Sequence, residues 1–239
     1  RNVDLQDELT RQEKLSAVGQ AISMLFHDLR NSVGNISSMA QLAIRHLNNH
    51  EYTVKMLQSI ASCADRGMKM ASDLLDFVSN KPVEKKQIIL PDLLDEIRKN
   101  AEETPLLKHA GLVISPVPRI EFPGDFSKMT RVLLNLINNA AEALTAMNHP
   151  APSIHLEVQR MDDNLVFRLK DNGPGLPEEI KDKLFLPFVT FGKVGGTGLG
   201  LAVVKHFVED HGGTVSVTTS AAGTEFTIII PAKINAEAQ

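Results

Sequence analysis

The sequence predicts an α+β fold, in which an N-terminal helical hairpin forms a dimeric four-helix bundle and an α/β sandwich follows. Three observations lead to this fold class. Apolar residues recur every three or four positions through the first third of the chain, helical and strand-like patterns alternate in the remainder, and Asn80-Lys81-Pro82 interrupts the chain between them. We therefore predict two domains, residues 1–81 and residues 82–239.

The N-terminal part carries two long amphipathic segments, from Val3 to His46 and, after the polar residues 48–50, from Leu57 to Val78. Each segment has more apolar stripe than one neighbour covers. We therefore expect two hairpins to associate as a homodimer, with an intramolecular bundle as the alternative. The predicted buried stripes consist of Leu15, Val18, Ile22, Leu25, Leu29, Val33, Ile36, Ala40, Ala43 and Leu47, and of Leu57, Ile60, Ala64, Gly67, Ala71, Leu74 and Val78.

One histidine of the first segment faces away from its apolar stripe. His27 lies two positions from both Leu25 and Leu29, about 200° around a helix, and Asn31 shares its face. Taken alone, such a histidine is usually a solvated surface residue. The other histidines show no metal-ligand spacing, and we interpret them as surface or turn residues: His46, His50, His109, His149, His155, His206 and His211.

The C-terminal part alternates helical and strand patterns, which predicts an antiparallel-rich sheet with helices on one face. The expected helices are Pro91 to Glu103, Asp125 to Met147 and Gly198 to His211. The expected strands are Leu112 to Ile114, Arg119 to Phe122, Ser153 to Arg160, Asn164 to Lys170, Thr214 to Thr218 and Glu225 to Ile230.

The composition excludes several classes of partner. A net charge of −4 and a pI near 6.1 argue against nucleic acid. The single cysteine, Cys63, excludes an internal disulfide and fits a reducing, cytoplasmic compartment. No apolar run is long enough to span a bilayer, so we expect no membrane contact from this part of the protein. Arg1 begins within a helical pattern, so we expect the chain to be a fragment of a longer protein that could be membrane-anchored.

Three polar stretches of the C-terminal part indicate a nucleotide site. Asn135 and Asn139 share one face of an otherwise apolar helix; their amides could ligate Mg²⁺ or, alternatively, bond to neighbouring backbone. Asp171 to Pro177 follows a strand and is either a simple turn or a site for an exocyclic amine. Gly192 to Leu201 opens a helix whose bare amides favour a phosphate, and a triphosphate would also need Mg²⁺ and a cation such as Lys193.

In this order, the three stretches resemble the N, G1 and G2 boxes of the two-component sensor histidine kinases. Leu184 to Phe188 resembles their F box, and Phe26-His27-Asp28-Leu29-Arg30-Asn31 resembles their H box. The resemblance runs from about Leu15 to Ile230. It implies a dimerisation and phosphoacceptor domain, followed by a Bergerat-type (GHKL) ATP-binding domain, with an upstream sensor domain missing from this fragment.

The resemblance also implies the reaction and the roles of single residues. ATP would phosphorylate His27, and the phosphoryl group would pass to an aspartate of a response-regulator receiver domain. Asp28 would hold or accept the imidazole proton, and Asn31 would orient water for dephosphorylation of the receiver. Asn139 would ligate Mg²⁺, Asn135 would assist at the phosphates and Asp171 would take the adenine amine. The remaining predicted nucleotide contacts are Gly173, Gly175, Lys193, Gly196, Thr197, Gly198, Leu199 and Gly200.

Two departures from the family pattern keep alternatives open. Glu142 stands where many members have Lys or Arg, and Ser32 follows Asn31 where many have Pro. A GHKL-type ATPase is one alternative, but such enzymes place a glutamate base four residues before the Mg²⁺ asparagine, and Asn135 cannot take a proton. The other alternative is a non-catalytic dimeric scaffold that binds nucleotide.

Overall fold

The computed structural model describes residues 26–27, 29–78, 82–108, 110–190 and 197–232. It divides the chain into two compact units, Arg1–Ser79 with Thr190–Thr197, and Asn80–Val189 with Gly198–Gln239. The predicted site residues Asp28, Lys193 and Gly196 lie outside the described residues, as does most of the predicted domain boundary, which stays a prediction.

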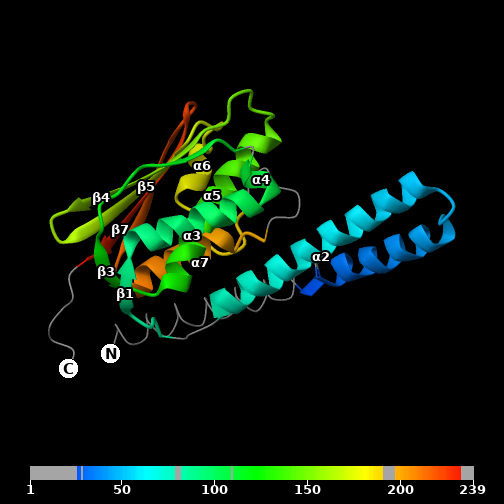
Figure 1. The fold of residues 1–239 in the computed structure, drawn as a ribbon, viewed down its shortest axis with the longest axis horizontal. Coiled ribbons are helices and arrows are strands. Elements are labelled where there is room, and N and C mark those ends of the chain that lie inside the picture. Colours follow the sequence, from blue (N-terminus) through cyan, green and yellow to red (C-terminus); the bar gives the residue numbers. More distant parts are fainter. Residues whose placement is uncertain (1–25, 28, 79–81, 109, 191–196, 233–239) are drawn as a thin grey trace. The chain divides into compact units, whose positions relative to one another are not determined.

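The first unit contains a helical hairpin, shown in blue and cyan in Figure 1. Residues 29–45 form its first helix, and α2 spans His50–Val78. The predicted turn between them is held by Asn49, whose Oδ1 accepts a hydrogen bond from the Tyr52 N–H at 3.1 Å. His46 completes the turn, because its carbonyl accepts a 2.9 Å hydrogen bond from Thr53 Oγ1.

The face that the two helices bury differs from the predicted stripe. The buried residues of α2 are Cys63, Gly67, Met70 and Asp73. Four predicted stripe residues are more than half exposed instead: Val33 (59%), Leu47 (68%), Leu57 (55%) and Val78 (52%). This exposure agrees with the expectation that one neighbour does not cover the whole stripe, because a single neighbouring helix covers only a narrow line of each helix; burial of these four in a dimer stays a prediction. None of the described helices combines the length and apolarity needed to cross a bilayer.

The second unit is an α/β sandwich built on a five-stranded sheet in the order β2-β4-β5-β7-β6. Strands β2 and β4 are parallel, and the other neighbours are antiparallel. A separate two-stranded ribbon pairs β1 with β3. The strands are β1 (Lys86–Ile89), β2 (Leu112–Ile114), β3 (Glu121–Gly124), β4 (Ile154–Met161), β5 (Asn164–Asp171), β6 (Thr214–Ser220) and β7 (Gly223–Pro231).

Three helices of this unit, α3 (Leu90–Glu103), α5 (Phe126–Ala146) and α7 (Gly200–Asp210), lie on one side of the sheet in Figure 1. The prediction of an antiparallel-rich sheet covered by helices on one face is therefore confirmed. Helix α5 begins where predicted because Asp125 caps it, with Oδ1 accepting from the Lys128 N–H at 3.1 Å. Three short elements were not predicted: β1, α4 (Pro105–Lys108) and α6 (Glu178–Lys181). Four residues are too few to display a periodicity.

Candidate functional site

The predicted phosphoacceptor lies on the exposed surface of the hairpin. His27 and Asn31 are both exposed, and Asn31 Nδ2 lies 3.2 Å from His27 Nδ1. The shared face expected from their spacing is therefore a direct side-chain contact. Since an amide can present either its oxygen or its nitrogen to an imidazole, this contact is compatible with both neutral tautomers of His27. Asn31 thus engages one ring nitrogen of the predicted nucleophile.

The two asparagines of α5 have different surroundings. Asn135 is buried, and its Nδ2 donates a 3.3 Å hydrogen bond to the carbonyl of Gly200 in the first turn of α7. Asn139, one turn further along α5, is half-buried. Asn135 therefore bonds to backbone, which was the predicted alternative to contact with a metal or phosphate. Its amide connects α5 to α7.

Asp171 ends β5 as a buried carboxylate, 6% exposed. Its Oδ1 accepts hydrogen bonds from the N–H groups of Gly173 at 2.8 Å and Thr224 at 3.2 Å. Burial raises the pKa of Asp171, and these two backbone hydrogen bonds oppose the rise. Both bonds go to the same oxygen, so Oδ2 is the atom that can accept from a ligand amine.

Glycine is required around this carboxylate. A Cβ atom on Gly173 would lie 2.9 Å from Asp171 Oδ1, and one on Gly223 would lie 1.9 Å from the Asp171 carbonyl oxygen. Gly175 has a φ of +73°, and the loop is held beyond it by the Leu176 N–H, which donates to Thr219 Oγ1 at 2.7 Å. The predicted loop from Asp171 to Pro177 is therefore packed against the β6–β7 turn.

The start of α7 is the predicted phosphate-binding end. Leu199 is fully buried, and as the N-cap residue it makes no side-chain hydrogen bond to the first N–H groups of α7. Gly198 has a φ of +65°, and its carbonyl accepts a 2.9 Å hydrogen bond from the Phe188 N–H. An uncapped helix N-terminus next to a positive-φ glycine suits an anion.

Thr197 is not grouped with these residues. It belongs to the first unit, where its Oγ1 donates a 3.1 Å hydrogen bond to Asp73 Oδ2 of α2. Among the described predictions, the second unit therefore brings together Asn135, Gly198, Leu199 and Gly200 through the start of α7, and Asp171, Gly173 and Gly175 at the end of β5.

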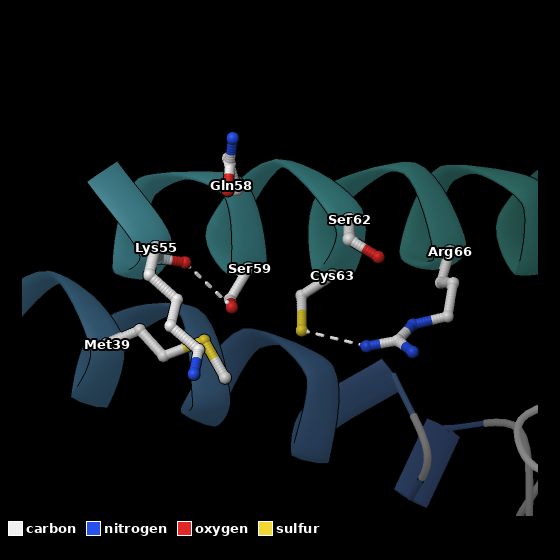
Figure 2. Close-up of a pocket in the computed structure, with 7 residues that line it drawn as sticks. All are labelled: Met39, Lys55, Gln58, Ser59, Ser62, Cys63 and Arg66. Carbon is white, nitrogen blue, oxygen red and sulfur yellow. Dashed lines mark hydrogen bonds between the residues drawn. The ribbon is translucent and has the colours of Figure 1, made fainter. Parts of the chain in front are cut away.

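A surface groove of about 360 Å³ lies on the hairpin, apart from the predicted residues (Figure 2). Cys63 Sγ lies at its floor and accepts a 3.0 Å hydrogen bond from the Arg66 guanidinium. No cluster of three or more His, Cys, Asp or Glu side chains suited to a metal occurs among the described residues. The groove is lined by Met39, Lys55, Gln58, Ser59, Ser62, Cys63 and Arg66.

Sequence reasoning missed the contacts of three residues in the second unit. His211 was interpreted as a surface or turn residue; it lies in the turn after α7, but it is not on the surface, since it is only 3% exposed and accepts a hydrogen bond from the Asp125 N–H. The backbone of Thr224 contacts Asp171 across 53 residues of sequence, which no local pattern reveals. Phe188 has an unusual φ of +68° where it meets Gly198.

Two family models match the chain. Residues 17–82 match the His Kinase A (phospho-acceptor) domain, and residues 124–234 match the histidine kinase-, DNA gyrase B- and HSP90-like ATPases. These matched ranges contain His27 and the nucleotide-site residues, respectively.

Several characterised proteins are similar over most of the chain. It is 30% identical to the sensory histidine kinase/phosphatase NtrB of Vibrio alginolyticus, over 97% of this chain and 68% of that protein. It is 32% identical to NtrB of Rhodobacter capsulatus, over 90% of this chain and 62% of that protein. Identity to the sensor histidine kinase ZraS of Escherichia coli K12 is 30%, over 96% of this chain and 49% of that protein. The chain thus spans about half to two thirds of the length of these relatives.

Solved structures share the fold. The nucleotide-free catalytic domain of histidine kinase ThkA matches with a TM-score of 0.54 and 29% identity, covering 62% of this chain and 96% of that domain. ThkA in complex with the response regulator protein TrrA matches with a TM-score of 0.72 and 23% identity, covering 96% of this chain and 66% of that one. The second likeness concerns the fold alone.

Proposed function

This chain belongs to the two-component sensor histidine kinases, and we propose that it transfers the γ-phosphoryl group of ATP to His27. The observation that carries the proposal is the presence in one chain of two complementary parts. One is an exposed imidazole whose Nδ1 is engaged by Asn31 at 3.2 Å. The other is an ATP-binding domain in which Asp171 presents one carboxylate oxygen. Beside it lie Gly173, which packs closely against the carboxylate, and Gly175, which has a positive φ.

The second unit would hold the nucleotide by its two ends. Asp171 Oδ2 would accept the adenine amine, while Oδ1 keeps its bonds to the backbone. The uncapped first turn of α7, beginning at Gly200, would bind phosphate oxygens through its N–H groups. The residues of the loop that precede it, including Lys193 and Gly196, stay predictions from the sequence.

Mg²⁺ fits this site through Asn139. The amide oxygen of asparagine is a ligand that Mg²⁺ accepts, and this cation is usually held by one or two protein oxygens together with substrate phosphates. Asn139 lies half-buried on α5, one turn from Asn135, whose contact with Gly200 links α5 to the start of α7. The metal would neutralise charge on the triphosphate, and Asn139 would hold the metal at the site.

The proposed transfer uses the Nε2 lone pair of neutral His27. Nε2 forms a bond to the γ-phosphorus, the bond from that phosphorus to the β,γ-bridging oxygen breaks, and ADP leaves with the electron pair. In this tautomer Nδ1 carries the proton and the Asn31 amide presents its oxygen to it. Asp28 is the predicted acceptor that would stabilise this proton.

We further propose that phosphorylated His27 donates its phosphoryl group to an aspartate of a receiver domain, and that Asn31 supports a second reaction, the hydrolysis of the receiver's aspartyl phosphate by water. The named activities of the NtrB relatives, kinase and phosphatase, support both reactions. Asn31→Ala should keep autophosphorylation, because Asp28 still holds the Nδ1 proton, and should lose dephosphorylation of the receiver. Unchanged dephosphorylation by Asn31→Ala would contradict the role given to this side chain.

A homodimer is the proposed form of the kinase. Exposed apolar residues remain on α2 at spacings of three, seven and eleven positions, which place them on one face of the helix that the hairpin does not cover. The match to a phosphoacceptor domain of histidine kinases supports pairing of two hairpins through this face. The exposed set on α2 comprises Val54, Leu57, Met68, Leu75 and Val78.

Incubation with γ-labelled ATP tests the function against its alternatives. A histidine kinase yields an acid-labile, base-stable label on the protein that His27→Gln abolishes. An ATPase of the same superfamily yields free phosphate without labelled protein, and a non-catalytic scaffold yields neither. Either of the last two results would overturn the proposal. Binding of MgADP to His27→Gln should be unchanged, because the proposed nucleotide contacts do not include His27.

A further inference from the structure

His211 is held by two hydrogen bonds at the end of α7. Its Nε2 accepts from the Asp125 N–H at 2.9 Å, and its Nδ1 lies 2.6 Å from the Phe207 carbonyl oxygen. A backbone N–H can only donate and a carbonyl can only accept, so Nε2 carries the lone pair and Nδ1 carries the hydrogen. The two backbone partners therefore require one neutral tautomer of the imidazole.

This histidine joins the first residue before α5 to the last turn of α7. Asp125 is also the N-cap of α5, so its N–H and its carboxylate serve two different helices. Packing is close, since a Cβ atom on Gly124 would lie 3.3 Å from His211 Cδ2. The junction is supported by Lys128, whose Nζ lies 3.0 Å from Asp210 Oδ2 and 5.0 Å from the centre of the Phe207 ring.

At its other end, α7 is connected to α5 through Asn135 and Gly200. The two connections lie at opposite ends of α7, which has 11 residues. The end of α7 contacts the start of α5, so the two helices are antiparallel. Helix α5 carries Asn139, and the start of α7 carries the N–H groups proposed for phosphate. A shift of α7 along or around α5 would therefore change the spacing between metal ligand and phosphate donors.

We propose that His211 is a positioning residue for nucleotide binding, because its hydrogen bond from Asp125 sets α7 against α5 and so places the phosphate-binding turn relative to Asn139. The proposal rests on the proposed function of the second unit as the ATP-binding domain. His211 lies at the far end of α7 from the nucleotide and acts through the helix.

The junction is sensitive to protonation. Protonated His211 would place an Nε2–H against the Asp125 N–H, replacing an attraction by a repulsion. Burial lowers the pKa of His211 from its ordinary value of 6.5. The bond to the Phe207 carbonyl and the charge of Asp125 raise this pKa, whereas Lys85 and Lys128 lower it. The other titratable groups of α7 at this end are Lys205, His206, Glu209 and Asp210. Because the pKa of His211 lies below its ordinary value, the imidazole is neutral and the junction intact at neutral pH, and the junction weakens as the pH falls toward that lowered pKa.

Two amide variants separate the two hydrogen bonds. Gln places its oxygen near the Nε2 position and can still accept from Asp125, whereas Asn reaches only the Nδ1 position and loses that bond. We expect His211→Asn to weaken MgADP binding about fivefold at pH 7.5, the effect of one net hydrogen bond, and His211→Gln to stay within about twofold of the unmodified chain. Calorimetric titration of the whole chain with MgADP measures both.

Two controls exclude a general loss of stability. Val158→Ala removes two buried methyl groups from the middle of β4, where Val158 pairs with Phe167 of β5 and not with Asp171, and should lower the melting temperature without changing MgADP affinity. His206→Gln removes a half-exposed histidine from the same helix and should keep the pH profile of the unmodified chain. As the pH is lowered from 7.5, the affinity of the unmodified chain should fall more steeply than that of His211→Gln.

Equal weakening by Asn and Gln, or weakening by Val158→Ala in proportion to its melting temperature, would overturn the proposal. If the unmodified chain bound no nucleotide, the proposed function would fail, and amide hydrogen exchange would still decide the role of His211. In that case faster exchange in the first turn of α7 in His211→Asn, but not in His211→Gln, supports positioning. Equal exchange in the two variants refutes it.

Discussion

The hairpin and the sandwich differ in how completely each buries its apolar surface. In the sandwich, the helices and the sheet leave residues such as Leu133, Leu165 and Val203 with no exposed surface. In the hairpin, by contrast, Leu57 and Leu75 are 55% and 70% exposed, and only a narrow line of α2 is buried. The sandwich is complete as a single chain, whereas the hairpin presents a surface that a second copy can cover. The proposed nucleotide site thus needs one chain only, whereas the proposed phosphoacceptor lies in the part whose exposed apolar face we propose to be covered by a second copy.

The largest expected effect is on dimerisation through the hairpin. Leu57→Glu places a charge on the exposed apolar face of α2. Burying a leucine is worth about 1.5–3 kcal/mol, and a symmetric dimer contains two copies, so dimerisation should weaken by about 3–6 kcal/mol. Light scattering during size-exclusion chromatography should show a monomer at micromolar concentration.

Gln58→Glu is the matched control, since it adds the same charge to an exposed, polar position next to Leu57. It should leave the mass of the particle unchanged. A dimer that survives Leu57→Glu but not Gln58→Glu would place the interface on another face of α2.

The second expected effect is on the stability of the sandwich. Gly175 has a φ of +73°, and a Cβ atom there would lie 2.0 Å from the Ser220 carbonyl oxygen. Gly175→Ala should therefore destabilise the second unit by about 2–4 kcal/mol through backbone strain and displacement of the β6–β7 turn. Thermal unfolding followed by circular dichroism should show an early transition for the sheet, with helix α2 melting as before. A single unshifted transition would contradict this.

The third expected effect separates the stability of the sandwich from its binding of nucleotide. Asp171→Asn keeps an oxygen for Gly173 and Thr224 but replaces the carboxylate proposed for the adenine amine. Affinity for MgADP should fall by about 1.5–3 kcal/mol, roughly ten- to a hundredfold, as measured by calorimetry.

The same variant should not lose stability without nucleotide. Burial raises the pKa of Asp171, so ionisation of this carboxylate disfavours folding as pH rises through the folded pKa. The neutral amide removes that cost, and the free energy of unfolding at pH 7 should rise slightly in urea titrations. A drop in unfolding free energy, with affinity retained, would show that the carboxylate is structural only.

The smallest expected effect is a gain in stability, opposite in sign to that of Gly175→Ala, although it also comes from replacing a glycine by alanine. Gly34 lies exposed in the helix of residues 29–45, and no atom lies within 4 Å of a Cβ built there. Gly34→Ala should stabilise the hairpin by about 0.5–1 kcal/mol, because alanine loses less backbone entropy in a helix. Urea unfolding monitored at the helical signal measures it, and a loss of stability would point to a role for Gly34 in bending the helix.

Local sequence patterns predicted most elements but fewer of their contacts. The start of α5 next to Asp125, the alternation in β4 and the shared face of His27 and Asn31 follow from periodicity alone. The bounds of α3, α5 and α7 agree with the predicted helices within about two residues. Short elements were missed because they are set by neighbours in space.

Which face is buried, and what a polar side chain meets, was decided only by the tertiary structure. Periodicity tells which residues share a face, and that is a local property of a helix or strand. The buried line through Cys63 and Met70 depends on the packing angle of two helices. The partners of Asn135 and His211 lie 65 and 86 residues away, so their contacts depend on how the chain closes on itself.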